Sequence, residues 1–172
     1  RRVMIPKADG SLRPLGIPTI RDRVAQMAVK LVIEPIFEAD FCEHSYGFRP
    51  KRSAHDAIDD IANRLWAGYT QVIDADLSKY FDSIPHGALL GLVQEHVAGG
   101  RVLELVGQLL GQGVLEDLKY WEPEEGTPQG GPLSPLLSNV VLDELDKELE
   151  RRGLEFCRFA DDCNVFVGSQ KA

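Results

Sequence analysis

The sequence predicts an α+β fold, in which short strands and amphipathic helices occupy separate stretches of one globular chain. Of its 172 residues, 44% are apolar and 27% are charged, which is the balance of a chain that buries a core. Apolar residues recur at three- and four-residue steps in some stretches and alternate in others, as helices and strands do. No run of about 18 apolar residues occurs, so we expect no membrane span.

The first 40 residues predict a hairpin followed by a helix. Asp9-Gly10 lies between the apolar stretches 3–5 and 12–17, which is a strong signal for a β-hairpin. A helix is predicted from Ile20 to Phe37, and we expect Pro35 to break it near its end. The residues that form its apolar face by spacing are Val24, Met27, Ala28, Leu31 and Val32.

The next segment predicts an irregular loop over residues 44–50 and then a second helix. Ser53 is a suitable N-cap for this helix, which we expect to reach Trp66 and to end before Gly68. Its apolar face by spacing consists of Ala54, Ala57, Ile58, Ile61 and Leu65. Tyr46 and Phe48, in the loop, are candidate core residues, Phe48 more so.

The remaining elements alternate between strands and helices. Residues 71–77 predict a strand with Asp74 and Asp76 on one face, because side chains two apart share a face. Ser134-Pro135 predicts the start of a helix that ends at Gly153. The other expected elements are helices over 87–97 and 101–112, a hairpin or arm over 114–121, and strands over 154–159 and 164–167. Asp161 and Asp162 fall in the tight turn between the last two strands.

Charge is distributed unevenly along the chain. Residues 1–52 contain ten basic and six acidic side chains, a net charge of +4, and the remaining 120 contain nine and 21, a net charge of −12. This asymmetry suits a protein that holds a polyanion with one part and divalent cations with the other. The alternative is an acidic domain with a scattered N-terminal excess of bases, and charge alone does not decide between them.

Cysteine usage favours reduced thiols over disulfides or a zinc site. Cys42, Cys157 and Cys163 form no CxxC pair and show no metal-ligand spacing with histidine, which is typical of a cytosolic protein. The chain starts without methionine and without a signal-peptide core, so we interpret it as a segment of a longer protein.

Three acids are candidate metal ligands. Asp76 lies near the end of one expected strand, and Asp161 and Asp162 lie between two others. Neighbouring carboxylates repel each other unless a cation compensates, and oxygen ligands suit Mg²⁺. Acids from separate strands could hold two Mg²⁺ ions about 3.5–4 Å apart for phosphoryl transfer. The alternative is a solvated turn with two acids and an unrelated acid at a strand end.

Residues 126–135 form a rigid loop of glycine and proline that leads into a helix N-terminus. Glycines without a Cβ would let a nucleotide or base pair approach the backbone closely. Gln129 would be the polar side chain at the apex of the loop. A loop with a helix cap explains Ser134 and Pro135, but it leaves the other glycines, prolines and Gln129 unexplained.

These blocks, in this order, resemble the reverse transcriptases encoded by bacterial group II introns, and the resemblance covers nearly the whole chain. The blocks are RPLGIPT at 13–19 with Asp22-Arg23, HSYGFRP at 44–50 with Arg52-Ser53, DLSKYFD at 76–82, GTPQGG at 126–131 with SPLL at 134–137, and FADD at 159–162. One departure is Phe159, where the family usually has tyrosine. This loss of one hydroxyl leaves both acids in place.

The resemblance implies the fingers and palm of a right-hand polymerase. Residues 1 to about 70 would supply most of the fingers, and residues 71–172 would form a palm with an antiparallel sheet backed by helices. The alternative is that fingers and palm interleave along the chain. Ten residues follow Asp162, so the thumb is not part of this chain.

The implied activity is RNA-directed DNA synthesis with two Mg²⁺ ions. Asp76 and Asp161 would be the main metal ligands and Asp162 a weaker third, whereas Asp74 would be structural. The partners would be an RNA template, a DNA or RNA primer, deoxynucleoside triphosphates (dNTPs) and, for an intron-encoded protein, the intron RNA. We expect a bacterial cytoplasmic location. A non-catalytic alternative is an RNA-binding maturase or defence-related scaffold, against which the intact acids argue.

Further residues are candidate contacts for nucleotide and template. Lys7 and Arg13 flank the turn of the first hairpin and could reach the triphosphate, unless they are ordinary exposed bases. The resemblance places Phe81 against the sugar of the incoming nucleotide, where it would exclude a 2′-hydroxyl, unless it is a core residue. Its neighbour Tyr80 would point the other way in an extended chain. The clustered bases Arg49, Lys51 and Arg52 would contact the template backbone.

Overall fold

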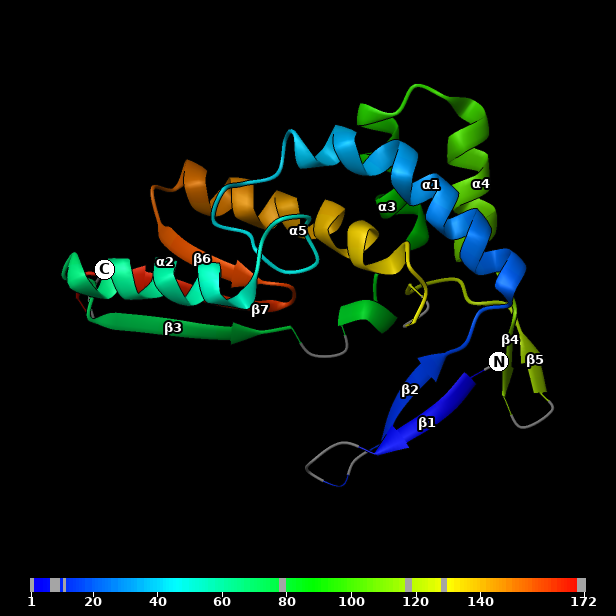
Figure 1. The fold of residues 1–172 in the computed structure, drawn as a ribbon, viewed down its shortest axis with the longest axis horizontal. Helices are drawn as coiled ribbons and strands as arrows, with labels where there is room; N and C mark the ends of the chain where they lie inside the picture. Colours follow the sequence, from blue (N-terminus) through cyan, green and yellow to red (C-terminus); the bar gives the residue numbers. More distant parts are fainter. Residues whose placement is uncertain are drawn as a thin grey trace. The chain divides into compact units, whose positions relative to one another are not determined.

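The computed structural model describes residues 2–6, 10, 12–77, 80–116, 119–127 and 130–169 (Figure 1). The chain forms two compact units, each built from two segments. The first unit contains Arg1–Phe37 and Lys79–Ser138, and the second contains Glu38–Ser78 and Asn139–Ala172. The two units interleave along the sequence. Their assignment as fingers and palm stays a prediction.

The first unit begins with the predicted hairpin. Strands β1 (Arg2–Pro6) and β2 (Leu12–Gly16) pair antiparallel, with Val3 opposite Leu15. Helix α1 (Ile20–Glu38) follows and, contrary to expectation, continues through Pro35. Proline has no backbone N–H, so the helix lacks the hydrogen bond from Pro35 to the carbonyl of residue 31. Pro35 lies in the last turn, where this loss affects the end of the helix alone.

The buried face of α1 also differs from the predicted one. Its buried residues are Gln26, Val29, Ile33 and Phe37, whereas Val24 and Leu31 are 65% and 64% exposed. Apolar residues lie on both sides of this helix, so their spacing could not distinguish the packed side from the exposed one.

The remainder of the first unit contains the predicted helices and second hairpin. The elements are the 3-10 turn η1 (Tyr80–Asp82), α3 (His86–His96), α4 (Gly100–Leu110), β4 (Val114–Glu116) and β5 (Lys119–Trp121). Strands β4 and β5 pair antiparallel. Helices α3 and α4 pack together, and Leu89, Val93 and Val106 are fully buried.

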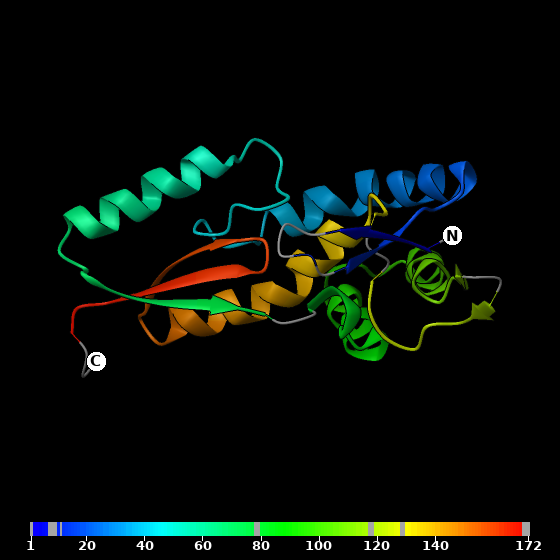
Figure 2. The same cartoon turned by 90° about the horizontal axis from the view of Figure 1, so that it is seen from below.

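The second unit is a three-stranded antiparallel sheet between two helices. Strands β3 (Gln71–Asp76), β7 (Asp162–Val167) and β6 (Glu155–Phe159) lie side by side in that order. Helix α2 (Ala54–Trp66) and the part of α5 (Ser134–Arg151) from Asn139 onward lie on opposite sides of the sheet (Figure 2). An antiparallel sheet backed by helices agrees with the predicted α+β fold.

Local sequence explains both helix starts and the state of the thiols. The Ser53 side chain accepts a hydrogen bond from the Asp56 backbone, and the Asp56 carboxylate accepts one from the Ser53 backbone, so α2 begins with a capping box. Helix α5 starts at Ser134, as predicted. The three cysteines are buried free thiols, and burial raises the pKa of Cys42 and Cys157 to about 12. None of the described helices is long and apolar enough to cross a membrane.

Candidate active site

The strand register of the second unit brings acids from two strands together. Asp76 on β3 lies directly opposite Asp162 on β7, and Asp74 lies opposite Asn164. Directly opposed residues in an antiparallel pair have Cβ atoms about 4.5–5.5 Å apart and share one face of the sheet. Asp162 is therefore a strand residue, whereas the sequence placed it in the turn.

Asp161 lies in the turn between β6 and β7, next to Asp162. Burial raises the pKa of the Asp162 carboxyl, and the negative charges of Asp161, Asp76 and Asp74 raise it further. The four acids therefore act on one another electrostatically, and a bound cation would relieve their repulsion.

The acids provide the oxygen ligands that a hard divalent cation prefers. Within the residues that the structure describes, no three His, Cys, Asp or Glu side chains form a ready-made metal cluster. Mg²⁺ is commonly held by one or two carboxylates, with water and substrate phosphates as its other ligands. Carboxylates at one edge of a sheet suit such an open site, and the assignment of Asp76, Asp161 and Asp162 as its ligands stays a prediction.

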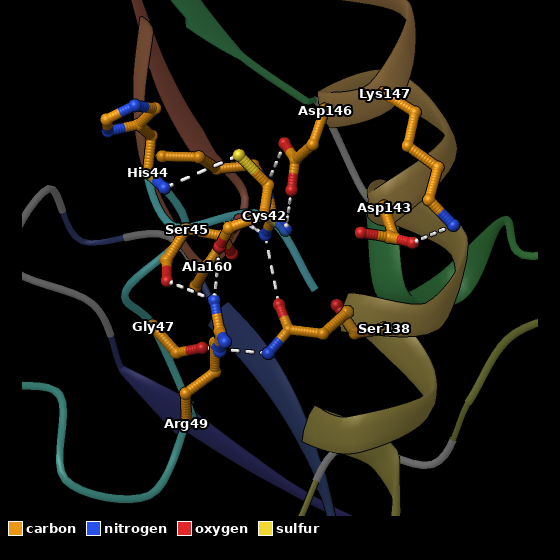
Figure 3. A network of polar contacts seen from close by, with 12 residues as sticks. Cys42, His44, Ser45, Gly47, Arg49, Ser138, Asp143, Asp146, Lys147 and Ala160 are labelled. Carbon is orange, nitrogen blue, oxygen red and sulfur yellow. Dashed lines mark hydrogen bonds and ion pairs between the residues drawn. The ribbon is translucent and has the colours of Figure 1, made fainter. Parts of the chain in front are cut away.

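A buried polar network supports the turn that carries Asp161 (Figure 3). It connects Arg158 on β6 with Asp146 and Asn139 on α5, and it reaches the backbone of Ala160 and Gly47. None of these three side chains was among the site residues predicted from the sequence. A visible signal was the charged Arg158 among the apolar residues of a predicted strand.

The structure gives Arg49 a different role from the predicted template contact. Its guanidinium forms an ion pair with Glu38 at 2.7 Å and donates hydrogen bonds to the carbonyls of Cys42 and Ser45. The residue is only 7% exposed, so its side chain holds the loop together instead of facing solvent.

The other predicted template contacts lie on the surface of the same loop. Lys51 is exposed, and Arg52 lies over the ring of Tyr46, 5.3 Å from its centroid, and donates to the carbonyl of Glu43. Phe48 was expected in the core, but it is 48% exposed. Both Phe48 and Lys51 have a φ of 61°, an unusual conformation for residues other than glycine.

The candidate nucleotide contacts belong to the first unit. Lys7 and Gln129 lie outside the described residues, and Arg13 is placed by its backbone in β2, opposite Ile5. Phe81 is 9% exposed and its ring lies 5.7 Å from that of Tyr80. The segment around Phe81 is a 3-10 turn and not an extended chain, so the argument that Tyr80 and Phe81 must face opposite sides does not hold.

The glycines of residues 126–131 have a reason within the protein itself. A Cβ on Gly126 would lie 2.9 Å from the backbone oxygen of Asp82, and φ at this glycine is 84°. A Cβ on Gly130 would overlap the carbonyl of Gly16, and one on Gly131 would overlap the side chain of Gln26. At these three positions close packing within the protein already requires glycine, and the approach of a nucleotide to this loop stays a prediction.

Comparison with known families then identifies the chain. Residues 5–172 match the family described as reverse transcriptase (RNA-dependent DNA polymerase). The chain belongs to the reverse transcriptase family. It is 45% identical over 158 residues to Protein YkfC of Escherichia coli (strain K12), covering 90% of this chain and 42% of YkfC. It is also 40% identical over 159 residues to the group II intron-encoded protein LtrA of Lactococcus lactis subsp. cremoris, covering 92% of this chain and 26% of LtrA.

Solved structures of reverse transcriptase relatives share the fold. A chain of the partial Cas6-RT-Cas1–Cas2 complex is 33% identical, with a TM-score of 0.56, over 92% of this chain and 28% of that one. Telomerase from Candida tropicalis is 12% identical with a TM-score of 0.71, over 99% of this chain and 36% of that one, which shows similarity of fold alone. The chain thus spans less than half of the relatives that it matches.

Proposed function

We propose that the protein containing this chain is an RNA-directed DNA polymerase. It joins dNTPs to a primer by attack of the primer 3′-hydroxyl on the α-phosphate. The observation that carries this proposal is the facing pair Asp76 and Asp162, with Asp161 beside it, in a chain of the reverse transcriptase family. Acids at these positions suit phosphoryl transfer, in which catalysis is mainly charge stabilisation.

Divalent metals are normal for this family, and Mg²⁺ is our specific proposal. When bound, two such ions would activate the attacking hydroxyl and stabilise the departing oxygen. Asp76 and Asp161 would provide the main ligands, and Asp162 would contribute a weaker one. Asp74, opposite Asn164, would stay outside the ligand set.

The first unit supplies the proposed nucleotide contacts. Lys7 and Arg13 bind the triphosphate, Gln129 contacts the nucleotide or base pair, and the ring of Phe81 excludes a 2′-hydroxyl. The burial of Phe81 is compatible with a ring held in one place, which a steric gate requires. A Phe81→Val protein that remains folded should incorporate ribonucleotides more readily than the parent. If the variant excludes ribonucleotides as well as the parent does, Phe81 is not the gate.

The second unit supplies the proposed template contacts. Lys51 and Arg52 bind template phosphates, which should make binding weaken with salt. Arg49 organises the loop that presents them, since its guanidinium is bound to Glu38 and to two backbone carbonyls. Replacing Lys51 and Arg52 by glutamine should flatten the salt dependence of template binding, and an unchanged slope would exclude this contact.

A second candidate is a protein that acts mainly by binding RNA, in intron splicing or in defence. Two similarities favour it as an alternative. The chain is 30% identical to Nuclear intron maturase 2, mitochondrial, of Arabidopsis thaliana, and it is similar to a chain of a Cas6-RT-Cas1–Cas2 complex. In either case an RNA such as the intron RNA would be the natural partner, and the bacterial cytoplasm is the proposed location.

Primer extension by the full-length parent separates the two candidates. The parent is given matched RNA and DNA templates, a primer, dNTPs and Mg²⁺, and Asp76→Asn serves as the control. We expect extension on RNA by the parent and none by the variant, with RNA binding equal in both. RNA binding without extension by the parent would favour the scaffold.

A further inference from the structure

Arg158 is a fully buried arginine with almost every donor occupied. Its Nε and Nη2 donate to the two carboxylate oxygens of Asp146 at 2.8 and 2.6 Å, and both side chains have no exposed surface. Its Nη1 donates to the side-chain oxygen of Asn139 at 3.0 Å and to the carbonyl of Ala160 at 2.7 Å. A guanidinium in this planar, bidentate arrangement has little freedom to move.

The side chain lies on the face of the sheet opposite the acids. Arg158 pairs in register with Cys163, whereas Phe159 pairs with Asp162. Because successive strand residues alternate, Arg158 points toward α5, and Asp76 and Asp162 point toward the other side. The hydrogen bond from Arg158 therefore reaches the turn that carries Asp161 through a backbone group.

The backbone group that it holds is the carbonyl of Ala160, which belongs to the peptide that joins Ala160 to Asp161. Ala160 has a φ of 57°, a left-handed conformation that residues with a side chain rarely adopt. Such a conformation persists only where the surroundings impose it. The hydrogen bond from Arg158 is one such restraint.

Gly47 provides a second restraint on the same turn. A Cβ at Gly47 would overlap the backbone nitrogen of Ala160, so the loop and the turn are in direct contact. Asn139 donates from Nδ2 to the carbonyl of Gly47 at 2.8 Å while it accepts from Arg158. Figure 3 shows Ala160 close to Gly47, with Asp146 above them on α5. The network thus fixes the turn from its carbonyl side and from its amide side.

Stability alone does not account for a buried ion pair at this point. The loss of hydration on burying both charges offsets much of their attraction, so apolar side chains of similar volume often stabilise a fold equally well. Apolar side chains cannot donate a hydrogen bond to the carbonyl of Ala160. The contact with Ala160 is therefore the distinguishing property of Arg158.

We propose that Arg158, held by Asp146 and Asn139, is a positioning residue that sets the orientation of Asp161. It fixes the peptide between Ala160 and Asp161, and so determines where the Asp161 carboxylate points. This inference rests on the proposed polymerase function, in which Asp161 is a metal ligand.

The test uses the full-length parent and a charge-free replacement of the pair, Arg158→Met with Asp146→Leu. This double variant keeps the core filled and removes both buried charges, but it also removes the donor to Ala160. Arg158→Lys is the second variant, because it keeps a positive charge beside Asp146. Arg64→Lys is the matched control, since Arg64 is also buried but pairs with Asp60 and with Glu155, at the opposite end of β6 from the turn.

Three measurements are made on each protein: melting temperature, kcat and KM in primer extension, and hydrogen exchange of the amides of residues 158–163. We expect a folded double variant, kcat lowered between about tenfold and a hundredfold, KM for primer and template within about twofold, and faster exchange in the turn. Arg158→Lys should show the same loss of kcat. Arg64→Lys should keep kcat within about twofold of the parental value, even if its melting temperature falls.

Two outcomes would overturn the proposal. One is a folded double variant, or a folded Arg158→Lys protein, with parental kcat and parental exchange in the turn. The other is an equal loss of kcat in Arg64→Lys, which would make the effect one of general stability. If the parent itself extends no primer, the proposed function fails, whereas hydrogen exchange still shows whether Arg158 fixes the turn.

Discussion

The two faces of the β3–β7–β6 sheet are built from alternate residues of the same strands, yet one face is apolar throughout its packed cluster and the other is part apolar and part acidic. The face toward α5 buries Phe156, Cys163 and Val165 against Leu145 and Leu149 in one apolar cluster. The face toward α2 has its apolar residues, Cys157 and Phe166, packed against Ala57 of α2. Near the β6–β7 turn this second face carries Asp76 and Asp162 instead.

The difference shows how one small sheet can support both a core and a cluster of like charges. Closely spaced carboxylates destabilise a fold unless other contacts compensate for their repulsion. The α5 face provides apolar burial, and the buried network of Arg158 holds the turn beneath the acids.

The largest effect is expected at the acids. Asp76→Ala or Asp161→Ala should reduce nucleotide addition to about one thousandth of the parental rate or less, because each removes a metal ligand from a reaction driven by charge stabilisation. Asp162→Ala should cost less. RNA binding should stay near the parental value, and the melting temperature should be no lower than that of the parent, because each change removes a like charge beside Asp162. Primer extension is the measurement. Near-parental extension by either of the first two variants would show that the ligands are wrongly assigned.

A core residue on the opposite face should show the reverse pattern. Phe156→Ala removes a fully buried ring from the α5 face and should lower the free energy of unfolding by about 3–5 kcal/mol. Urea denaturation measures this loss. At urea concentrations below the unfolding transition, the folded variant should retain the parental KM for dNTPs. A changed KM with unchanged stability would mean that the two faces are not functionally separate.

A smaller effect is expected where α2 begins. Ser53→Ala removes one half of the capping box and should cost about 1 kcal/mol of unfolding free energy. Since α2 covers only the apolar end of its face, kcat should be unaffected. Ser53→Asp is the control, because aspartate also caps helices well and should restore the stability. If kcat fell in Ser53→Ala and stayed low in Ser53→Asp, α2 would contribute to the active site as well as to stability.

The sequence could predict elements that are specified by neighbouring residues. The hairpin around Gly10, the capping by Ser53 and the shared face of Asp74 and Asp76 follow from local chemistry, and the structure confirms them. The exposed and buried sides of α1 depend on distant contacts, and the predicted face was wrong. The burial of Arg49 also depends on distant contacts, which its place in a basic cluster does not reveal.

The ordered motifs gave the family correctly, since their specificity does not depend on packing. The motifs pointed to Asp76, Asp161 and Asp162 as candidate metal ligands, which stays a prediction, and they did not point to the residues that hold the turn. Arg158, Asp146 and Asn139 come together only when β6 packs on α5. Register likewise decides that Asp162 faces Asp76, and register between distant strands cannot be read from one sequence.

The smallest effect is expected at Asp74, which shares the acidic face but stands opposite Asn164. Asp74 is one of the charges that raise the pKa of Asp162, so the folded state binds a proton at Asp162 more tightly than the unfolded state does. The resulting contribution favours folding at acidic pH and is lost as pH rises through the raised pKa of Asp162. Asp74→Asn should therefore increase stability at neutral pH, by roughly 0.2–1 kcal/mol for one like-charge contact across strands, and much less near pH 3. Thermal melting at both pH values in the absence of divalent metal measures this difference. Primer extension by the same variant should remain within about twofold of the parent, whereas a loss like that of Asp76→Ala would place Asp74 among the metal ligands.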